Sequence, residues 1–162
     1  MDFHPQKCSF LRVTKSHKPF QANYTLKGFS LHEGTITKYL GVDLQSDLGW
    51  TSHINKKIKK ANSILGFIKR NLQKTSENTK TTAYFSLVRP NLDYCATIWN
   101  PHHQNLSKNI EKVQRRAARF ATNRYRNTSS VSDMISQLNW ESLESRHQKQ
   151  QLTMFYKIVN NQ

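Results

Sequence analysis

A change in hydrophobic spacing near residue 50 constrains the fold of this chain more than any other feature. From Thr51 onward the apolar residues recur every three or four positions instead of every second one. An α-helix has 3.6 residues per turn, so this spacing places them on one helix face over about five turns. We therefore predict a helix at 51–72, with one face that other elements must cover. The residues of this face are Ile54, Ile58, Ala61, Leu65, Ile68 and Leu72.

Further helices are predicted downstream of this one. A helix at 76–88 should begin at Ser76 and end before Pro90, because proline disrupts a helix interior. Its inward residues are expected to be Ala83, Tyr84, Leu87 and Val88. Other helices are predicted at 91–98, 105–122, 129–138 and 140–160.

The last predicted helix, 140–160, is amphipathic and nearly neutral. We expect its apolar face to pack in the core rather than to bind a partner. That face consists of Leu143, His147, Leu152, Phe155, Tyr156 and Val159.

The first fifty residues have the spacing of strands. Short strands are predicted at 8–14, 23–32 and 36–44, the last from the alternation in ITKYLGVDL. Three strands without a helix cannot bury both faces of a sheet, so they suit the edge of a larger β structure. The predicted fold is α+β and mainly α, with a β segment at 1–50 and a helical bundle at 51–162.

Positive charge is concentrated in the middle of the chain. The formal net charge is +15, and residues 48–130 contain sixteen basic and three acidic side chains. Within the predicted helix 105–122, the stretch KVQRRAARF has apolar residues on one face and basic residues on the other. The apolar set is Ile110, Val113, Ala117 and Phe120, and the basic set is Lys108, Lys112, Arg115 and Arg119.

A surface of this kind is typical of proteins that bind a polyanion. A solvated helix face is the alternative for any single helix, but the helix at 51–72 repeats the same design. The candidate nucleic-acid-binding residues are Lys56, Lys57, Lys59, Lys60, Arg70, Lys108, Lys112, Arg115, Arg116, Arg119, Arg124 and Arg126.

Motifs for catalysis or metal binding are not found in the sequence. There is no glycine-rich phosphate loop, and Asp43 and Asp47 are better explained as residues that shape the turn before Trp50. His102 and His103 lack the spacing of a zinc site. Cys8 and Cys95 form no disulfide framework and suit a reducing compartment. No apolar stretch has the length of a membrane span, and membrane-surface binding by the basic helices is a minor alternative.

Six segments have a resemblance to a known family: KYLGV (38–42), DLGWTSHI (47–54), KKANSILGFIKRNL (59–72), AYFSLVRPNLDYCATIWNP (83–101), EKVQRRAARFAT (111–122) and LNWESLESRHQKQQLTMFYKIVN (138–160). Together they resemble the region after the catalytic palm of non-LTR, LINE-type (jockey-like) retrotransposon reverse transcriptases. The resemblance covers most of the chain. It implies the end of the palm followed by the thumb of an RNA-directed DNA polymerase.

The resemblance also implies roles for particular residues. Tyr39, Leu40, Gly41 and Val42 match the hairpin that holds the 3′ end of the primer, where Gly41 would let two backbones approach closely. Lys7 in PQKCSFLRV matches a lysine suggested to protonate the leaving pyrophosphate, and so is a candidate general acid. The basic helices would hold a template–primer duplex through its phosphates, without reading its sequence.

The family's catalytic aspartates, which hold Mg²⁺, are absent from these 162 residues. We therefore expect the fragment alone to be inactive, to have no cofactor of its own, and to need the palm and fingers as partners. Whether Met1 is a true start stays open. The family role implies the nucleus; otherwise the compartment is nucleus or cytoplasm. The alternative function is a domesticated or decayed remnant that acts as a helical protein-interaction module.

Overall fold

The structure is a computed structural model that describes residues 4–14, 16–126 and 128–161. The chain forms two compact units, Met1–His53 and Ile54–Gln162. We call them the strand unit and the helical unit and describe each by itself. The mixed α+β class, with short strands first and helices after them, is confirmed.

The strand unit contains three separate two-stranded pairings instead of one sheet. After the short helix η1 (Pro5–Lys7), β1 (Ser9–Leu11) pairs in parallel with β4 (His32–Gly34). Between them, β2 (Thr25–Leu26) and β3 (Phe29–Ser30) form a hairpin. Its turn residues, Lys27 and Gly28, both have positive φ, as the tightest hairpin turns require. The strand predicted at 8–14 is therefore shorter in the structure, and the range 23–32 contains a hairpin instead of one strand.

The strand predicted at 36–44 is wrong, because these residues form a hairpin. β5 (Ile36–Tyr39) and β6 (Val42–Gln45) pair antiparallel, with Tyr39 opposite Val42. Leu40 and Gly41 make the two-residue turn with φ of 46° and 83°. Because the chain reverses here, Val42 and Leu44 share a face with Thr37 and Tyr39 and not with Ile36.

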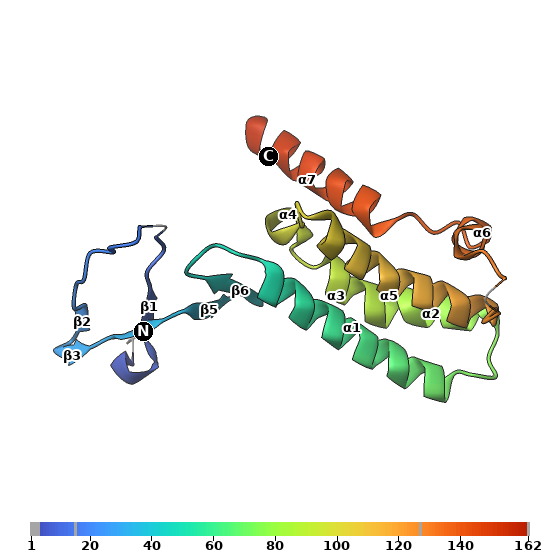
Figure 1. The fold of residues 1–162 in the computed structure, drawn as a ribbon, viewed down its shortest axis with the longest axis horizontal. Helices are drawn as coiled ribbons and strands as arrows, with labels where there is room; N and C mark the ends of the chain where they lie inside the picture. Colours follow the sequence, from blue (N-terminus) through green and yellow to red (C-terminus); the bar gives the residue numbers. More distant parts are fainter. Residues whose placement is uncertain (1–3, 15, 127, 162) are drawn as a thin grey trace. The chain divides into compact units, whose positions relative to one another are not determined.

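In the helical unit, α1 (Thr51–Asn71) carries the predicted apolar stripe on its inner face. Ile54, Ala61, Leu65 and Ile68 are buried, while Ile58 and Leu72 are half-buried. The long helix α5 (Gln104–Thr122) runs beside α1 in Figure 1. α5 also contacts α2, α6 and α7, so it is the central helix of this unit.

The helix at 76–88 does not end before Pro90 as predicted. Ser76 caps α2 (Glu77–Ala83) by accepting the backbone N–H of Thr79, as expected. The chain then forms a π-helical turn, η2 (Tyr84–Val88), and continues into α3 (Arg89–Asp93). The wider turn places Pro90 near the start of α3. The backbone N–H that proline lacks would have no helical acceptor at this position.

The predicted helix 91–98 is two helices. Cys95 has a left-handed backbone, with φ of 56°, and separates α3 from α4 (Ala96–Trp99). The bend turns Trp99 into the core, where its side chain is fully buried and its Nε1 donates to the Tyr94 carbonyl at 2.9 Å. Leu87, predicted to face inward, is exposed.

Two capped helices complete the unit, α6 (Val131–Gln137) after Ser130 and α7 (Leu143–Val159) after Ser142. Leu143 and His147 in the first half of α7 are buried, as predicted. The prediction of core packing is wrong for the second half, because the bundle does not extend that far along α7. The exposed residues there are Leu152, Phe155, Tyr156 and Val159, together with Met154 and Ile158.

Candidate nucleic-acid interface

The central helix α5 has one face in the core and one face in solvent. Its inner face contains the four predicted residues, Ile110, Val113, Ala117 and Phe120, and all four are buried. Its outer face is basic: Lys108, Lys112, Arg115 and Arg116 are exposed and Arg119 is half-buried. The expected division of KVQRRAARF into an apolar and a basic face is therefore confirmed. The basic face is exposed from Lys108 to Arg116 and partly covered at Arg119.

A buried glutamine helps to fix the rotation of α5 about its axis. The Tyr84 hydroxyl of η2 donates to Gln114 Oε1 at 2.9 Å. Gln114 Nε2 donates to the Glu141 backbone carbonyl, also at 2.9 Å. Burial raises the pKa of Tyr84 far above its usual value, so this hydroxyl keeps its proton and can donate it to Gln114. Tyr84 also stacks on Trp140, with ring centroids 4.5 Å apart.

Glu111 on α5 turns its carboxylate away from the basic face and toward the start of α7. Its Oε1 accepts the backbone N–H groups of Leu143 at 2.5 Å and Glu144 at 3.2 Å. Burial raises the pKa of Glu111, and these two hydrogen bonds offset part of the rise. A carboxylate at the first turn of a helix is stabilised by the free N–H groups there. Glu111 therefore acts as a cap for α7 from another helix.

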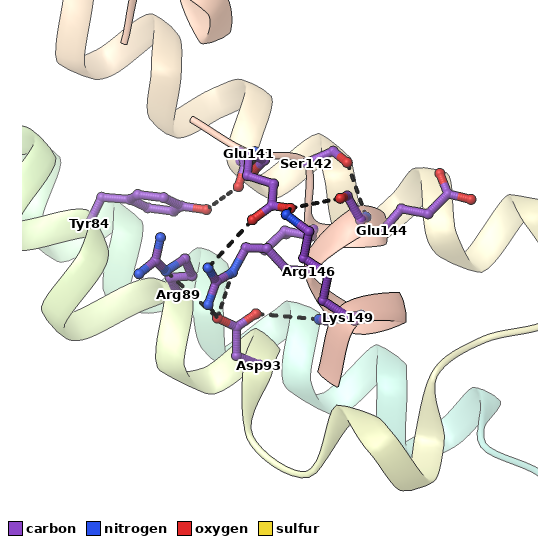
Figure 2. A network of polar contacts seen from close by, with 12 residues as sticks. Tyr84, Arg89, Asp93, Glu141, Ser142, Glu144, Arg146 and Lys149 are labelled. Atoms are coloured by element: carbon purple, nitrogen blue, oxygen red, sulfur yellow. Dashed lines mark hydrogen bonds and ion pairs between the residues drawn. The ribbon is translucent and has the colours of Figure 1, made fainter. Parts of the chain in front are cut away.

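Asp93 at the end of α3 is contacted by three basic side chains. Figure 2 shows it facing Arg146, whose Nη2 lies 2.9 Å from its Oδ2. Arg89 Nε lies 3.6 Å from the same carboxylate, and His147 Nε2 lies 3.4 Å from Oδ1. Burial alone would raise the pKa of Asp93, but His147 and Arg146 outweigh it and the pKa is lowered. Arg89 and Arg146 are thus engaged inside the bundle.

Three cations from α1 and α5 lie close together where the two helices meet. Arg116 Nη1 donates to Asn62 Oδ1 on α1 at 3.0 Å. The pKa of Lys69 on α1 is lowered by burial, and further by the charges of Arg116 and Arg119. Lys69 was not among the predicted residues. Lys69 follows Asn62 by seven residues, about two turns of α1, and so lies on the same flank of the helix. That spacing could have identified Lys69 from the sequence.

The other predicted cations are spread along the helical unit. Lys56, Lys59, Lys60 and Arg70 are on α1, and Arg124 and Arg126 are exposed after α5. Lys57 lies on the opposite flank of α1, with its Nζ 5.2 Å from the Tyr94 ring centroid. Of the predicted lysines of α1, Lys57 is half-buried, whereas Lys56, Lys59 and Lys60 are exposed.

The predicted primer-grip residues form the tip of the hairpin in the strand unit. Tyr39 and Leu40 are 66% and 72% exposed, whereas Val42 is buried. The Asp43 backbone N–H donates to His53 Nδ1 at 3.2 Å, a hydrogen bond within the strand unit. The φ of 83° makes Gly41 a turn residue, a conformation that glycine adopts without strain.

Two further predicted residues, Lys7 and Asp47, lie outside the helices that carry the basic face. Lys7, the candidate general acid, is exposed at the end of η1. Asp47 shapes a turn as expected, since its Oδ1 accepts the Gly49 N–H at 2.8 Å. The same prediction is wrong for Asp43, which lies in β6 opposite Lys38.

Sites for a metal or a membrane are not evident in the described residues. There, no three His, Cys, Asp or Glu side chains gather in a way that would hold a metal ion. Within the same ranges, each helix is too short or too polar to cross a membrane.

Comparison with known proteins gives no relative: no protein-family model matches the chain, and no curated protein or solved structure matches it.

Proposed function

We propose that the helical unit binds nucleic acid through backbone phosphates, using the basic face of α5 and its neighbours on α1. The observation that carries this proposal is the placement of the few acidic residues. Residues 48–130 contain Glu77, Asp93 and Glu111 as their only acids. Asp93 is engaged by Arg146, and Glu111 caps α7. In the described residues, no carboxylate pairs with Arg115, Arg116 or Arg119.

A row of cations without counter-charges repels itself, and a polyanion relieves that repulsion. Binding of this kind releases counterions from the nucleic acid and weakens steeply as salt rises. Contacts to phosphates position a duplex and carry no base information. The proposed activity is thus sequence-independent binding.

The resemblance noted above supports a more specific role. We propose that the chain is the palm end and thumb of a non-LTR retrotransposon reverse transcriptase, which holds a template–primer duplex. The exposed hairpin tip, with Tyr39 and Leu40, would then contact the primer, and Lys7 would be the candidate general acid. Catalysis and Mg²⁺ binding would depend on palm residues outside this sequence, and the site of action would be the nucleus.

The test is a salt titration of duplex binding by fluorescence anisotropy. Arg115→Ala with Arg119→Ala should weaken binding to RNA/DNA duplexes of unrelated sequence by similar factors. The slope of log K against log salt should fall by about 0.9 for each phosphate that the variant no longer neutralises. Lys18→Ala with Lys157→Ala, two exposed lysines that no described carboxylate contacts, removes the same charge as a matched control. Equal effects of both pairs would show that only net charge matters and would contradict the proposal.

A second candidate function rests on α7. Its second half exposes apolar residues on more than one side, which is unusual for a helix in water. The alternative function named above is a domesticated or decayed remnant that acts as a helical protein-interaction module. Such a module would bind its partner through this surface. The two functions differ in one measurement: a thumb should prefer a template–primer duplex over single strands at moderate salt, and an interaction module should not.

A further inference from the structure

A basic hollow lies where the C-terminal ends of α1 and α5 meet. Its volume is about 320 Å³, and all of its lining belongs to the helical unit. The lining residues are Lys69, Arg70, Gln73, Phe120, Asn123 and Tyr125. This volume falls at the lower end of the range for small-molecule sites.

The hollow is positively charged from several sides. Lys69 lies close enough to Arg116 and Arg119 for their charges to lower its pKa. The fully buried Lys80 donates from Nζ to Oδ1 of the lining residue Asn123 at 2.7 Å. Among the described residues, no carboxylate contacts Lys69, Arg70 or Lys80. The partial negative charge at the C-terminal ends of α1 and α5 favours nearby cations. It is too small to balance the charges of Lys69, Arg70 and Lys80 together. An anion in the hollow would relieve the repulsion.

The hollow also has an aromatic wall. Tyr125 is 57% exposed, and Lys69 Nζ lies 5.9 Å from its ring centroid. An exposed ring beside cations is the arrangement with which proteins hold single-stranded nucleic acid, since bases stack on the ring while phosphates meet the charges.

We propose that this hollow binds one unpaired nucleotide of a nucleic-acid strand, with its base stacked on Tyr125 and its phosphate beside Lys69 and Arg70. The inference rests on the proposed function and deepens it: the basic face holds the duplex, and the hollow holds a strand end that leaves it.

The test compares three probes by fluorescence anisotropy at one salt concentration. They are a blunt duplex, the same duplex with a three-nucleotide single-stranded extension, and the same extension made abasic. The abasic extension keeps the phosphates and removes the bases. The wild-type chain should bind the natural extension about fivefold more tightly than the abasic one, the lower end for one stacked base.

Three variants locate the effect. Tyr125→Ala should abolish the preference for bases, and Tyr125→Phe should keep it because the ring remains. Tyr156→Ala, which removes a similarly exposed ring from α7, should also keep it. Circular dichroism at 222 nm should show that each variant retains its helices.

The outcomes separate the two proposals. Two outcomes would overturn the proposal that the hollow binds a nucleotide but would not contradict duplex binding. One is equal binding of the natural and abasic extensions, and the other is a preference for bases that persists in Tyr125→Ala. Loss of the preference in the Tyr156→Ala control has the same meaning. Failure to bind any of the three probes overturns the proposed function and the hollow together.

Discussion

The strand unit and the helical unit are stabilised in different ways. Among the described residues of the strand unit, Val42 is the one apolar side chain that is buried. Its shape comes from turns, such as Lys27-Gly28 and Leu40-Gly41, and from short pairings. The helical unit instead has a continuous core that contains Trp99, Tyr84 and Phe120. Local backbone chemistry therefore governs the first unit, and side-chain packing governs the second.

Removing a core side chain should reveal this difference most strongly. Trp99→Ala removes a fully buried ring and its hydrogen bond to Tyr94, so it should lower the free energy of unfolding by about 3–5 kcal/mol. Val42→Ala should lower it by about 1.5 kcal/mol at most, because only two methylene equivalents leave a buried site. Urea unfolding followed at 222 nm measures both. Similar changes in the two variants would contradict the contrast between the units.

Removing a buried polar link tests whether the helical core depends on more than apolar packing. Gln114→Leu leaves the Tyr84 hydroxyl and the Glu141 carbonyl without their partner. The free energy of unfolding should fall by about 1–3 kcal/mol, since buried polar groups without partners are unfavourable. Gln148→Leu, on the exposed side of α7, is the matched control and should change stability little. An equally large decrease in the control would rule out a special role for Gln114.

Acid should weaken the helical unit through Asp93. The pKa of Asp93 is lower in the folded chain than its usual 3.8, so its contacts stabilise the fold at neutral pH. That contribution is complete above pH 3.8 and is lost as the pH falls through the folded pKa. The stability difference between wild type and Asp93→Asn should therefore shrink below about pH 3.8. Urea midpoints of both proteins, measured from neutral pH to below pH 3.8, give this stability difference. A stability difference that grows in acid would contradict the stabilising role of the Asp93 carboxylate.

Two glycine substitutions give the smallest effects, with opposite signs. Gly41→Ala forces alanine into φ of 83° and should destabilise the hairpin by about 1 kcal/mol. Gly66→Ala lies within α1, where a new Cβ would meet only Arg70 Nη1 at an ordinary 3.6 Å. It should stabilise the helical unit by about 0.5–1 kcal/mol. Hydrogen exchange of the hairpin amides and urea midpoints measure the two effects. Equal signs would show that backbone preference does not distinguish the units.

The sequence predicts best where one helix face has to be buried. The inner residues of α5 follow directly from their spacing, and Ser76 follows from the chemistry of helix caps. Alternation is a weaker guide, because residues 36–44 alternate in sequence although the chain reverses at Leu40. Leu-Gly is also not one of the usual hairpin turn pairs. Periodicity alone could not reveal that turn.

Other features depend on contacts between distant residues. The spacing of α7 indicates an apolar face, but it does not say whether another element will cover residues 152–159. The cap that Glu111 provides links residues 32 positions apart in the chain, so no local pattern reveals it. The hollow beside Tyr125 likewise depends on the ends of two helices meeting. The sequence could therefore predict where positive charge gathers, but it could not predict the hollow.

The contacts that hold α5 have a consequence for conformational entropy. Gln114 and Glu111 fix one side of the helix, and the bond from Arg116 to Asn62 fixes the other. A helix held on both sides loses little backbone freedom when a ligand arrives, so mainly the outer side chains must be ordered. Binding to this face should therefore proceed without a coupled folding step, and its heat-capacity change should be small.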